Sequence, residues 1–493
     1  MMKKIQQKAA IAALTVLIGG GALLPVQAKA AAAGPVASAS AYFDQSVEQV
    51  IQQLVSQKVL QGYEDGTIRA EKKITNAELI KMIVLALDLE TASDSKAVSN
   101  KWYTPYVDAA VAAGLIESAQ GFRPNQPASS ADAAQYIAKA LQRDTKSVQY
   151  WMSGMKIDGK ELNRGDAAKL LVLSEQAIRS SNAEIVSIKA LNKITFEVTF
   201  TAPLTLTDET TDQANANFTF SDGIKLVNQP RLKTGAIATY IIPVQTMKPG
   251  STYSLNYKGK QDFTALASDE MIQLQNARQV TSDTFEVESF RSGGVIDYGY
   301  LISAYAGGRG ADAVVLDDNN KLNGQQMQII SSLATRQAVL TSETGEQTTV
   351  NYVGFTQSTD GKQEPKFRLP AGKTLQPGVK YTVTSDWFAV KNNTFTAQSI
   401  EPLEIAAVDK VNDTTLNVTL TADPGDELFA YRSIALKGSD GTTLTAQYKV
   451  QTRKGAVGVF ELQNNGKLGA GVQYEVTPVG SWATASNVKL SSN

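Results

Sequence analysis

The chain has 493 residues, of which 43% are hydrophobic and 19% charged, and its formal net charge at pH 7 is −1. This length predicts several folded domains, and the near-neutral charge without a basic tract argues against nucleic-acid binding. The sequence contains no histidine and no cysteine. It therefore excludes disulfides, zinc sites built from imidazole or thiolate, and the commonest general base of enzymes.

The N-terminus has the pattern of a secretory signal. Three lysines precede an apolar run at 9–24, and small-residue cleavage sites follow at Ala28 and Ala30. A membrane anchor is the alternative, but the run is short for a bilayer span and is interrupted by glycines. We therefore predict a signal peptide at 1–30 and a linker at 31–41, with no membrane span after processing.

A helical unit of about 45 residues begins after the linker. Its first copy, at about 42–90, contains the glycine-punctuated turn GYEDGTIR at 62–69. Thr75 then precedes Glu78 by three residues, which is the spacing of a helix capping box. Apolar residues recur downstream at i, i+3, i+4 and i+7, so we predict a helix with one buried face.

Two weaker copies of this unit follow, at about 100–143 and 147–180. Ser129 and Asn163 occupy the cap position in these copies, and an aspartate stands three residues after each cap. One copy is too small to bury its own apolar face. We therefore expect the three copies to pack together as an all-α domain spanning 42–180.

These motifs resemble the S-layer homology domain, which anchors proteins to the cell wall of Gram-positive bacteria. The matching signatures are YFD at 42–44, GYEDGTIR at 62–69, WYTPYVDAAVAAGLI at 102–116 and GFRP at 121–124. The resemblance implies a pseudo-threefold bundle of three repeats. It also implies that the grooves between repeats bind secondary cell-wall polysaccharide, often through an acidic, pyruvylated sugar.

An anionic sugar needs a guanidinium for its carboxylate and an aromatic face for its ring. The arginine of the family motif maps only onto Arg164, because Asn76 and Ser130 stand at the equivalent positions. This difference suggests unequal grooves. Tyr42 and Trp102 could equally be core residues. The candidate polysaccharide-binding residues are Arg164, Arg69, Arg123, Trp102, Tyr42, Tyr103 and Trp151.

From residue 184 onward the apolar period changes to two, and Val, Ile, Thr and Phe are frequent, which indicates β-strands. Three blocks share a two-strand opening and an ending in which a glycine turn leads to Tyr253, Tyr381 or Tyr474. A tyrosine soon after such a turn is typical of the tyrosine corner of β-sandwiches. The blocks resemble the Ig-like modules of bacterial surface proteins. We predict three all-β Ig-like sandwich domains, at 184–269, 270–401 and 402–493.

The middle block is the longest and includes a glycine-rich, acidic stretch at 305–326. This stretch lacks the Gly-Lys-Ser/Thr of a phosphate-binding loop, so we interpret it as a hairpin insertion. The resemblance implies that calcium can help such arrays assemble, although no stretch has the spacing of an EF-hand loop. The acidic residues considered for calcium are Asp317, Asp318, Asp423, Asp426 and Glu427.

The preferred interpretation is a secreted, non-enzymatic protein of a Gram-positive surface layer. The helical domain would hold the wall polysaccharide, and the β-domains would self-associate into a lattice. A wall-anchored adhesin that uses its outer β-domains for ligand binding is the alternative. A wall-associated hydrolase is disfavoured, because the sequence has no nucleophile elbow, metalloprotease helix or Walker loop.

Overall fold

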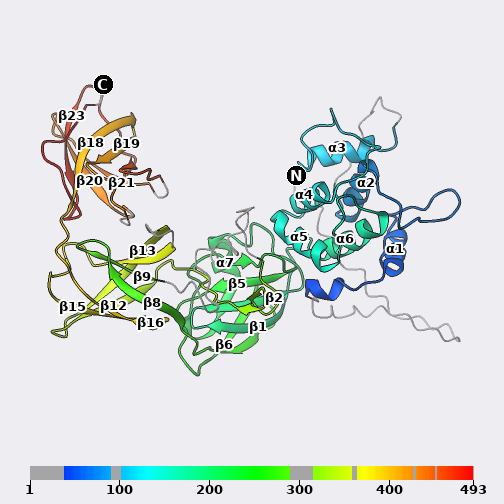
Figure 1. Cartoon of the computed structure of the whole chain (residues 1–493), viewed down its shortest axis with the longest axis horizontal. Coiled ribbons are helices and arrows are strands. Elements are labelled where there is room, and N and C mark those ends of the chain that lie inside the picture. The colour runs from blue at the N-terminus through cyan, green and yellow to red at the C-terminus, as the bar shows by residue number, and fades with distance from the viewer. Residues whose placement is uncertain are drawn as a thin grey trace. The chain divides into compact units, whose positions relative to one another are not determined.

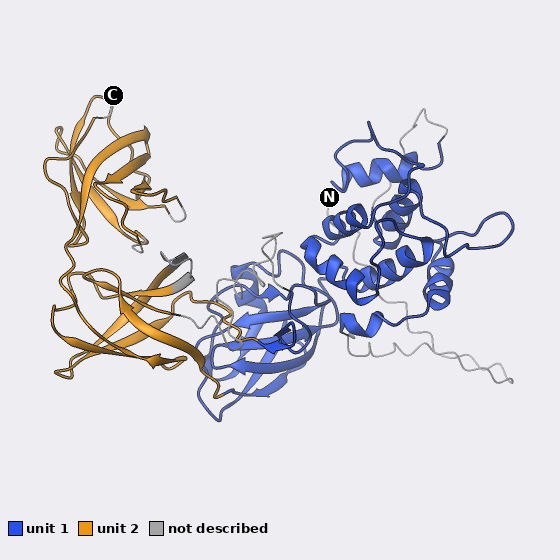
Figure 2. Cartoon of the chain, viewed as in Figure 1, with its two compact units in different colours: residues 1–268, 302–326 blue, residues 269–301, 327–493 orange. Residues whose placement is uncertain are grey.

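The computed structural model describes residues 38–89, 101–288, 315–357, 363–425, 429–449 and 452–491. The predicted signal peptide lies outside these residues. The chain divides into two compact units, coloured separately in Figure 2. Unit 1 comprises 1–268 and 302–326, and unit 2 comprises 269–301 and 327–493. No helix within the described ranges is both long enough and apolar enough to cross a membrane.

The first part of unit 1 is helical (Figure 1). Its elements are the 3-10 helix η1 (Ala39–Tyr42) and the α-helices α1 (Val47–Ser56), α2 (Asn76–Ala86), α3 (Thr104–Ala112), α4 (Ser130–Ala140), α5 (Thr145–Gly154) and α6 (Arg164–Gln176). Helices α2, α4 and α6 begin where the sequence predicts. The side chains of Thr75, Ser129 and Asn163 each accept a hydrogen bond from the third amide of the helix that follows.

Three backbone hydrogen bonds close the repeats into a ring. The amide of Ile74 donates to the carbonyl of Leu162 (3.1 Å), that of Leu162 to Ala128 (3.1 Å), and that of Ala128 to Ile74 (2.8 Å). All three residues directly precede a helix cap and are fully buried. The outer helices follow the same cycle, since α3 contacts α2, α5 contacts α4 and α1 contacts α6. This cyclic arrangement confirms the predicted pseudo-threefold bundle.

A β-sandwich follows the helices in unit 1. Its elements are β1 (Ile185–Asn192), β2 (Thr195–Phe200), α7 (Thr211–Asn217), β3 (Phe218–Phe220), η2 (Ser221–Gly223), β4 (Arg231–Leu232), β5 (Thr239–Pro243), β6 (Thr252–Tyr257) and β7 (Phe263–Leu266). One sheet has the order β1-β2-β5-β4 and the other β3-β6-β7. Aromatic rings fill the space between the sheets, with Phe200 edge-on to both Tyr240 and Tyr257.

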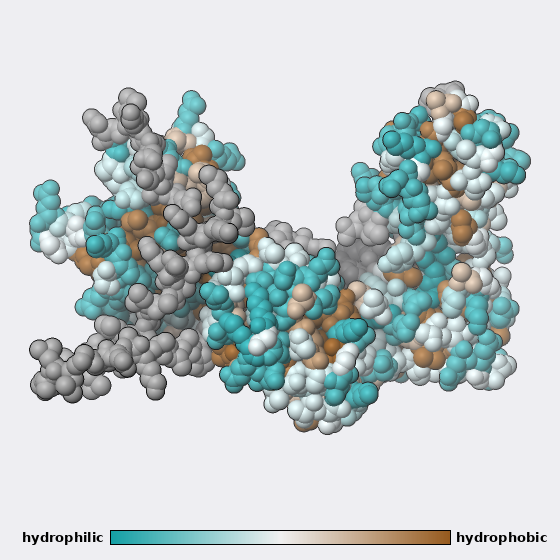
Figure 3. Space-filling model, turned by 180° about the vertical axis from the view of Figure 1, so that it is seen from behind, coloured by the Kyte–Doolittle hydropathy of each residue, from teal (hydrophilic) through white to brown (hydrophobic). Residues whose placement is uncertain are grey.

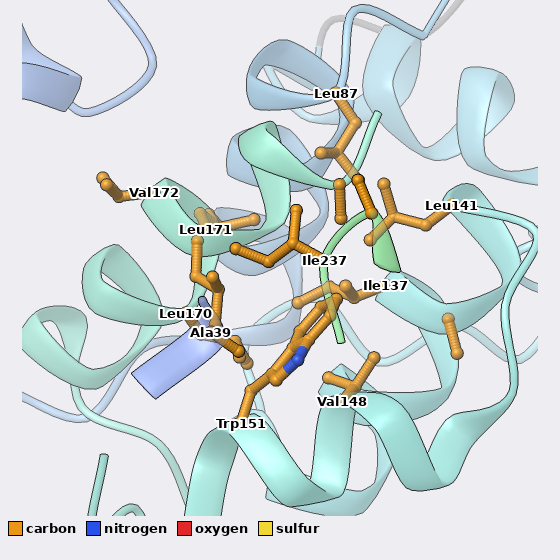
Figure 4. Close-up of a cluster of buried hydrophobic side chains, with 14 of the residues drawn as sticks. Ala39, Leu87, Ile137, Leu141, Val148, Trp151, Leu170, Leu171, Val172 and Ile237 are labelled. Atoms are coloured by element: carbon orange, nitrogen blue, oxygen red, sulfur yellow. The ribbon is translucent and has the colours of Figure 1, made fainter. Parts of the chain in front are cut away.

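The helical bundle and this first sandwich share one hydrophobic core. Figure 4 shows Ile237, from the sandwich, among Ile137, Leu171 and Trp151 of the bundle. The indole N–H of Trp151 donates to the carbonyl of Gly235 at 2.7 Å. The sequence predicts separate domains at 42–180 and 184–269. In the structure they share a core, because Ile237 of the sandwich packs among residues of the bundle and Trp151 of the bundle bonds to Gly235 of the sandwich.

Unit 2 contains two sandwiches of the same topology. The strands of the first are β8 (Ile272–Gln279), β9 (Thr284–Val287), β12 (Gln337–Ser342), β13 (Gln347–Gln357), β14 (Gln363–Arg368), β15 (Lys380–Thr384), β16 (Phe388–Asn392) and β17 (Thr394–Thr396). Those of the second are β18 (Leu403–Asn412), β19 (Thr415–Leu420), β20 (Ser433–Gly438), β21 (Thr443–Tyr448), β22 (Val457–Leu462), β23 (Gln473–Pro478), β24 (Ala483–Thr484) and β25 (Lys489–Ser491).

The strand orders match element by element: β16-β8-β9-β14-β13-β12-β15-β17 corresponds to β24-β18-β19-β22-β21-β20-β23-β25. The first pair of each order is parallel. The last strand of each order packs against the second, because β17 contacts β8 and β25 contacts β18. The strands show the expected period, as in β22, where every second residue is buried. Repetition in sequence therefore corresponds to repetition in fold.

Each of the three sandwiches contains the tyrosine corner that the sequence predicts. The hydroxyls of Tyr253, Tyr381 and Tyr474 each accept a hydrogen bond from the backbone amide five residues upstream, at 2.9, 3.0 and 2.8 Å. This bond fixes the turn before β6, β15 and β23, so the short Gly-x-x-Tyr signal is enough to locate the corner.

Candidate functional site

The surface itself does not single out a site by hydrophobicity. On the face in Figure 3, hydrophobic residues form separate patches among hydrophilic ones. Trp102 is one of the large apolar side chains that remain exposed, at 54%. Isolated exposed apolar residues are common on proteins, so the exposure of Trp102 alone does not mark a binding site. The charged groups and aromatic rings around Trp102 are the stronger indication.

Arg164, the first residue of α6, lies inside the bundle with a side chain only 5% exposed. Its Nη1 forms an ion pair with Oε1 of Glu78 at 2.8 Å. Its Nε donates to the carbonyl of Ile68 at 2.9 Å, and its Nη2 donates to the carbonyl of Gln61 at 2.8 Å. The guanidinium thus connects the third repeat to the turn and second helix of the first.

The same position in the other repeats makes a smaller contact. Asn76 donates through Nδ2 to the carbonyl of Arg123 at 3.0 Å, which connects repeat 1 to the turn of repeat 2. Ser130 donates through Oγ to the carbonyl of Gly159, which connects repeat 2 to repeat 3. The three junctions are therefore equivalent in geometry, and only the junction of repeat 3 with repeat 1 carries a charged side chain at this position.

Cations surround the ring of Tyr63 in the turn of repeat 1. The guanidinium carbon of Arg69 lies 4.2 Å from the ring centre, Nζ of Lys72 lies 4.7 Å away, and the guanidinium carbon of Arg164 lies 5.0 Å away. Asp65 pairs with Arg69 at 2.8 Å. Hydrogen bonds from Thr67 and then Arg69 hold the pKa of Asp65 below its usual value, so this pair stays ionised.

A second set of contacts extends this arrangement to Trp102. Nζ of Lys81 donates to Oε1 of Gln61 at 2.8 Å and lies 5.9 Å from the Trp102 ring and 5.7 Å from the Tyr106 ring. Burial and the nearby charge of Arg164 lower the pKa of Lys81. Gln61 thus contacts Arg164 through its backbone and Lys81 through its side chain.

We refer to these residues as the repeat-1 cluster. Its members are Gln61, Tyr63, Arg69, Lys72 and Lys81 of repeat 1, together with Trp102 at the start of repeat 2. The sequence identifies Arg69 and Trp102 but misses the others. Lys81 carried a signal, because it is a lone cation within the apolar run of α2. Lys81 beside the exposed indole of Trp102 can receive an anionic ring compound, and Arg69 and Lys72 add positive charge around the ring of Tyr63.

The remaining aromatic and cationic candidates lie in different environments. Arg123 is exposed on the turn of repeat 2, and its side chain makes no ion pair within the described ranges. Tyr42 and Tyr103 are half-buried, and burial raises the pKa of Tyr42. Trp151 is fully buried and bonded to Gly235. Burial therefore removes Trp151, together with Arg164, from the residues that could contact a ligand directly.

The acidic candidates have partners within the protein. Asp317 accepts the amides of Asn319 and Lys321, and Asp318 accepts the hydroxyl of Ser40. A further candidate, Asp423, pairs with Arg453 at 2.9 Å. The last two candidates, Asp426 and Glu427, lie outside the described residues. Within the part of the chain that the structure describes, no three acidic side chains are grouped so as to hold a metal.

The comparison with protein families decides the identity of the bundle. The model of the S-layer homology domain matches residues 45–80 and 93–134. The helical region is an S-layer homology domain. The family model covers the first two repeats, and the hydrogen-bonded ring of Ile74, Ala128 and Leu162 adds the third.

Curated relatives match parts of the chain. The "Surface layer protein" of Brevibacillus choshinensis is 26% identical over 220 residues, which are 39% of this chain and 19% of that protein. The "S-layer protein sap" of Bacillus anthracis is 31% identical over 101 residues, 20% of this chain and 12% of that protein. The chain thus spans about a fifth or less of the length of these relatives.

A solved structure also resembles the chain. The "N-terminal part of the bacterial S-layer protein SbsC" matches at 14% identity and covers 73% of this chain and 77% of that one. The TM-score of this match is 0.19, which is too low to support an argument about the arrangement of domains. The assignment of the S-layer homology domain therefore depends on the family match and on the threefold geometry.

Proposed function

We propose that this chain is a structural surface-layer protein and that its S-layer homology domain anchors it non-covalently to secondary cell-wall polysaccharide of a Gram-positive envelope. The repeat-1 cluster is the observation that carries this proposal. It combines the exposed indole of Trp102 with the ammonium group of Lys81. Gln61 connects this pair to Arg164, which lies with Arg69 and Lys72 around the ring of Tyr63. The family match and the names of the relatives support the same assignment.

Lys81 and Trp102 supply the primary contact in this proposal. The ammonium group of Lys81 is held by Gln61 beside the Trp102 ring, so a carboxylate on the sugar would meet the charge while the sugar ring covers the indole. A pyruvylated sugar has this combination of carboxylate and ring. Arg164 acts as a positioning residue, because it holds Gln61 and the turn of repeat 1 from within. The chemistry is binding without turnover.

The β-sandwiches supply the outer part of the layer in this proposal. The two sandwiches of unit 2 share one strand order, which suits a chain that builds an array from similar blocks. We propose that they associate with copies of themselves in a lattice. Electron microscopy of the purified mature chain, with and without calcium, tests this part. Regular sheets are expected, and monodisperse monomers under both conditions would overturn lattice formation and leave the anchoring proposal standing.

Sedimentation with purified wall sacculi tests the anchoring. Trp102→Ala and Lys81→Ala should each reduce the bound fraction, with an affinity loss of roughly tenfold, since each removes one contact to the sugar. Lys160→Ala is the matched control, because Lys160 is an exposed lysine on the turn of repeat 3. Native-like binding by both cluster variants, with unchanged circular dichroism, would overturn the choice of site.

A further inference from the structure

The connection between the second and third strands of the middle sandwich is much longer than its counterparts. Residues 288–336 join β9 to β12, apart from the short strands β10 (Lys321–Leu322) and β11 (Gln325–Gln326). The equivalent connection in the last sandwich, between β19 and β20, comprises only 421–432, and that in the first comprises 201–217. The middle sandwich would not need this extra length to close its own sheet.

Within the described part of this connection, residues 315–326 belong to unit 1 and residues 327–336 to unit 2. The strands before and after residues 315–326 in sequence are in unit 2. Strands β10 and β11 pair as a hairpin, with Lys321 opposite Gln326 and Leu322 opposite Gln325. The chain thus leaves unit 1 at 268, returns to it with this hairpin, and leaves it again at 326.

The segment 315–326 contacts a buried ion pair of the first sandwich. Glu197 of β2 and Lys233, which follows β4, are both buried, and their charged groups lie 3.8 Å apart. Nζ of Lys233 donates to the carbonyl of Asp317 at 2.6 Å. Asn320 is only 3% exposed and donates through Nδ2 to Oε2 of Glu197 at 2.9 Å. Both charges therefore have a hydrogen-bond partner in the residues that lead into the hairpin, which limits the cost of their burial.

The same segment contacts the junction with the S-layer homology domain. The hydroxyl of Ser40, in η1, donates to Oδ2 of Asp318 at 2.9 Å. Val315 lies against Gly235, where an added Cβ would come within 2.8 Å of Val315 Cγ1 and 2.9 Å of the Tyr150 ring of α5. The close approach at Gly235 (φ 85°) requires glycine for both space and backbone conformation.

We propose that residues 315–326 act as an intramolecular strap, which fastens the chain of the middle sandwich onto the joint between the S-layer homology domain and the first sandwich. Tension on the outer sandwiches then reaches the anchor through the buried contacts of the strap as well as through the peptide link at 268–269. The contacts of the strap are all within the chain, so they form whether or not the S-layer homology domain has bound a polysaccharide.

A matched pair of asparagine variants tests the strap in the full mature chain. Asn320 and Asn323 both lie in the segment 315–326 with left-handed backbone (φ 60° and 50°), but Asn320 is buried and bonded to Glu197, whereas Asn323 is exposed. Asn320→Asp places a second carboxyl group against Glu197, whereas Asn323→Asp makes the same chemical change in water. Hydrogen exchange in 315–326 and in 233–237 should accelerate roughly tenfold or more in Asn320→Asp and stay native-like in Asn323→Asp.

A disulfide cross-link between positions 40 and 318 measures docking of the strap in a chain that keeps Asn320. The chain contains no cysteine, so the double variant Ser40→Cys, Asp318→Cys can form only one intramolecular disulfide. Near-complete oxidation is expected while the strap is docked, and adding Asn320→Asp should reduce it. Failure of the pair to oxidise, or unchanged exchange in Asn320→Asp, would overturn the strap.

Discussion

Glu78 pairs with Arg164 at 2.8 Å while its other carboxylate oxygen accepts the backbone amide and the hydroxyl of Thr75. One side chain therefore completes the capping box of α2 and joins repeat 1 to repeat 3. The first function follows from local spacing, since Thr75 and Glu78 are three residues apart. The second does not, because Arg164 is far away in sequence.

Replacing Arg164 should destabilise the bundle. Arg164→Ala leaves the carboxylate of Glu78 and the carbonyls of Gln61 and Ile68 without their partner, and removing one member of a buried pair costs about 3 kcal/mol. Thermal unfolding followed by helical circular dichroism should show a lower midpoint. The exposed Arg123 is the control, and Arg123→Ala should unfold like the native chain. Equal midpoints for both variants would contradict the structural role of Arg164.

The helical part of the fold was predictable where its signals are local. The caps Thr75, Ser129 and Asn163 precede helices in the structure because a polar side chain must satisfy the first free amides of each helix. Threefold packing also followed, since a single repeat leaves an apolar face uncovered. The tyrosine corners were predictable for the same reason, as each depends on a hydroxyl and an amide five residues apart.

The candidate site was only partly predictable, because burial depends on contacts between distant parts of the chain. Trp151 resembles an exposed ring in the sequence, yet it is covered by Gly235 of the first sandwich. Lys81 is a cation in an apolar helix, and its importance appears only when Gln61 and Trp102 are placed beside it. Strand periodicity likewise locates the sandwiches and cannot show that the first one shares a core with the bundle.

The shared core makes a prediction about Arg143, which follows α4. Its Nη1 donates to the carbonyl of Ile237 at 3.0 Å and its Nη2 to that of Ala236, while its guanidinium carbon lies 5.0 Å from the centre of the Trp151 ring. Burial lowers the pKa of Arg143 to about 10, so the group stays charged at neutral pH. Arg143→Ala should accelerate hydrogen exchange in α4, in α5 and in 233–239 together.

The control for Arg143 is Lys160→Ala, which changes an exposed cation of the same bundle. Exchange in this variant should match the native chain in both regions. If Arg143→Ala accelerated exchange only in the helices, the bundle and the first sandwich would be separate cooperative units, contrary to their common core.

A buried ion pair joins the two sandwiches of unit 2. Arg432 donates to both carboxylate oxygens of Asp283, at 2.6 and 2.8 Å. Burial alone would raise the pKa of Asp283, but the hydrogen bonds and charge of Arg432, with the charge of Arg368, lower it from 3.8 to about 2. The pKa of Asp283 is lower in the folded state than in the unfolded state, so the pair stabilises the folded state fully above pH 3.8. This contribution of about 2 kcal/mol is lost as the pH falls through about 2.

Asp283→Asn should remove that pH dependence. In the native chain, the free energy of unfolding of unit 2 should decline as the pH falls from 3.8 toward 2, and the variant should lack this part of the decline. Asp440→Asn is a useful comparison, because Asp440 is an exposed acid of the last sandwich whose pKa is lowered by local hydrogen bonds, mainly from Thr442, and not by an ion pair. Parallel acid profiles for native chain and Asp283→Asn would show that the pair adds no stability.

Glu175 of α6 predicts the opposite pH dependence in the bundle. Its Oε2 accepts hydrogen bonds from Gln53 (3.1 Å) and Gln57 (3.3 Å) at the contact with α1, and burial nevertheless raises its pKa from 4.5 to about 7. A carboxyl group with the higher pKa in the folded state binds its proton more tightly there. The free energy of unfolding therefore falls as the pH rises from 4.5 to about 7, by at most about 3 kcal/mol, and is then constant.

Glu175→Gln should remove this decline and be the more stable protein at neutral pH, as measured by denaturant unfolding across that window. Glu117→Gln, at an exposed position, should keep the native profile. A native-like decline in Glu175→Gln would mean that the carboxyl group is hydrated in the folded bundle and that the contact between α1 and α6 is looser than its hydrogen bonds indicate.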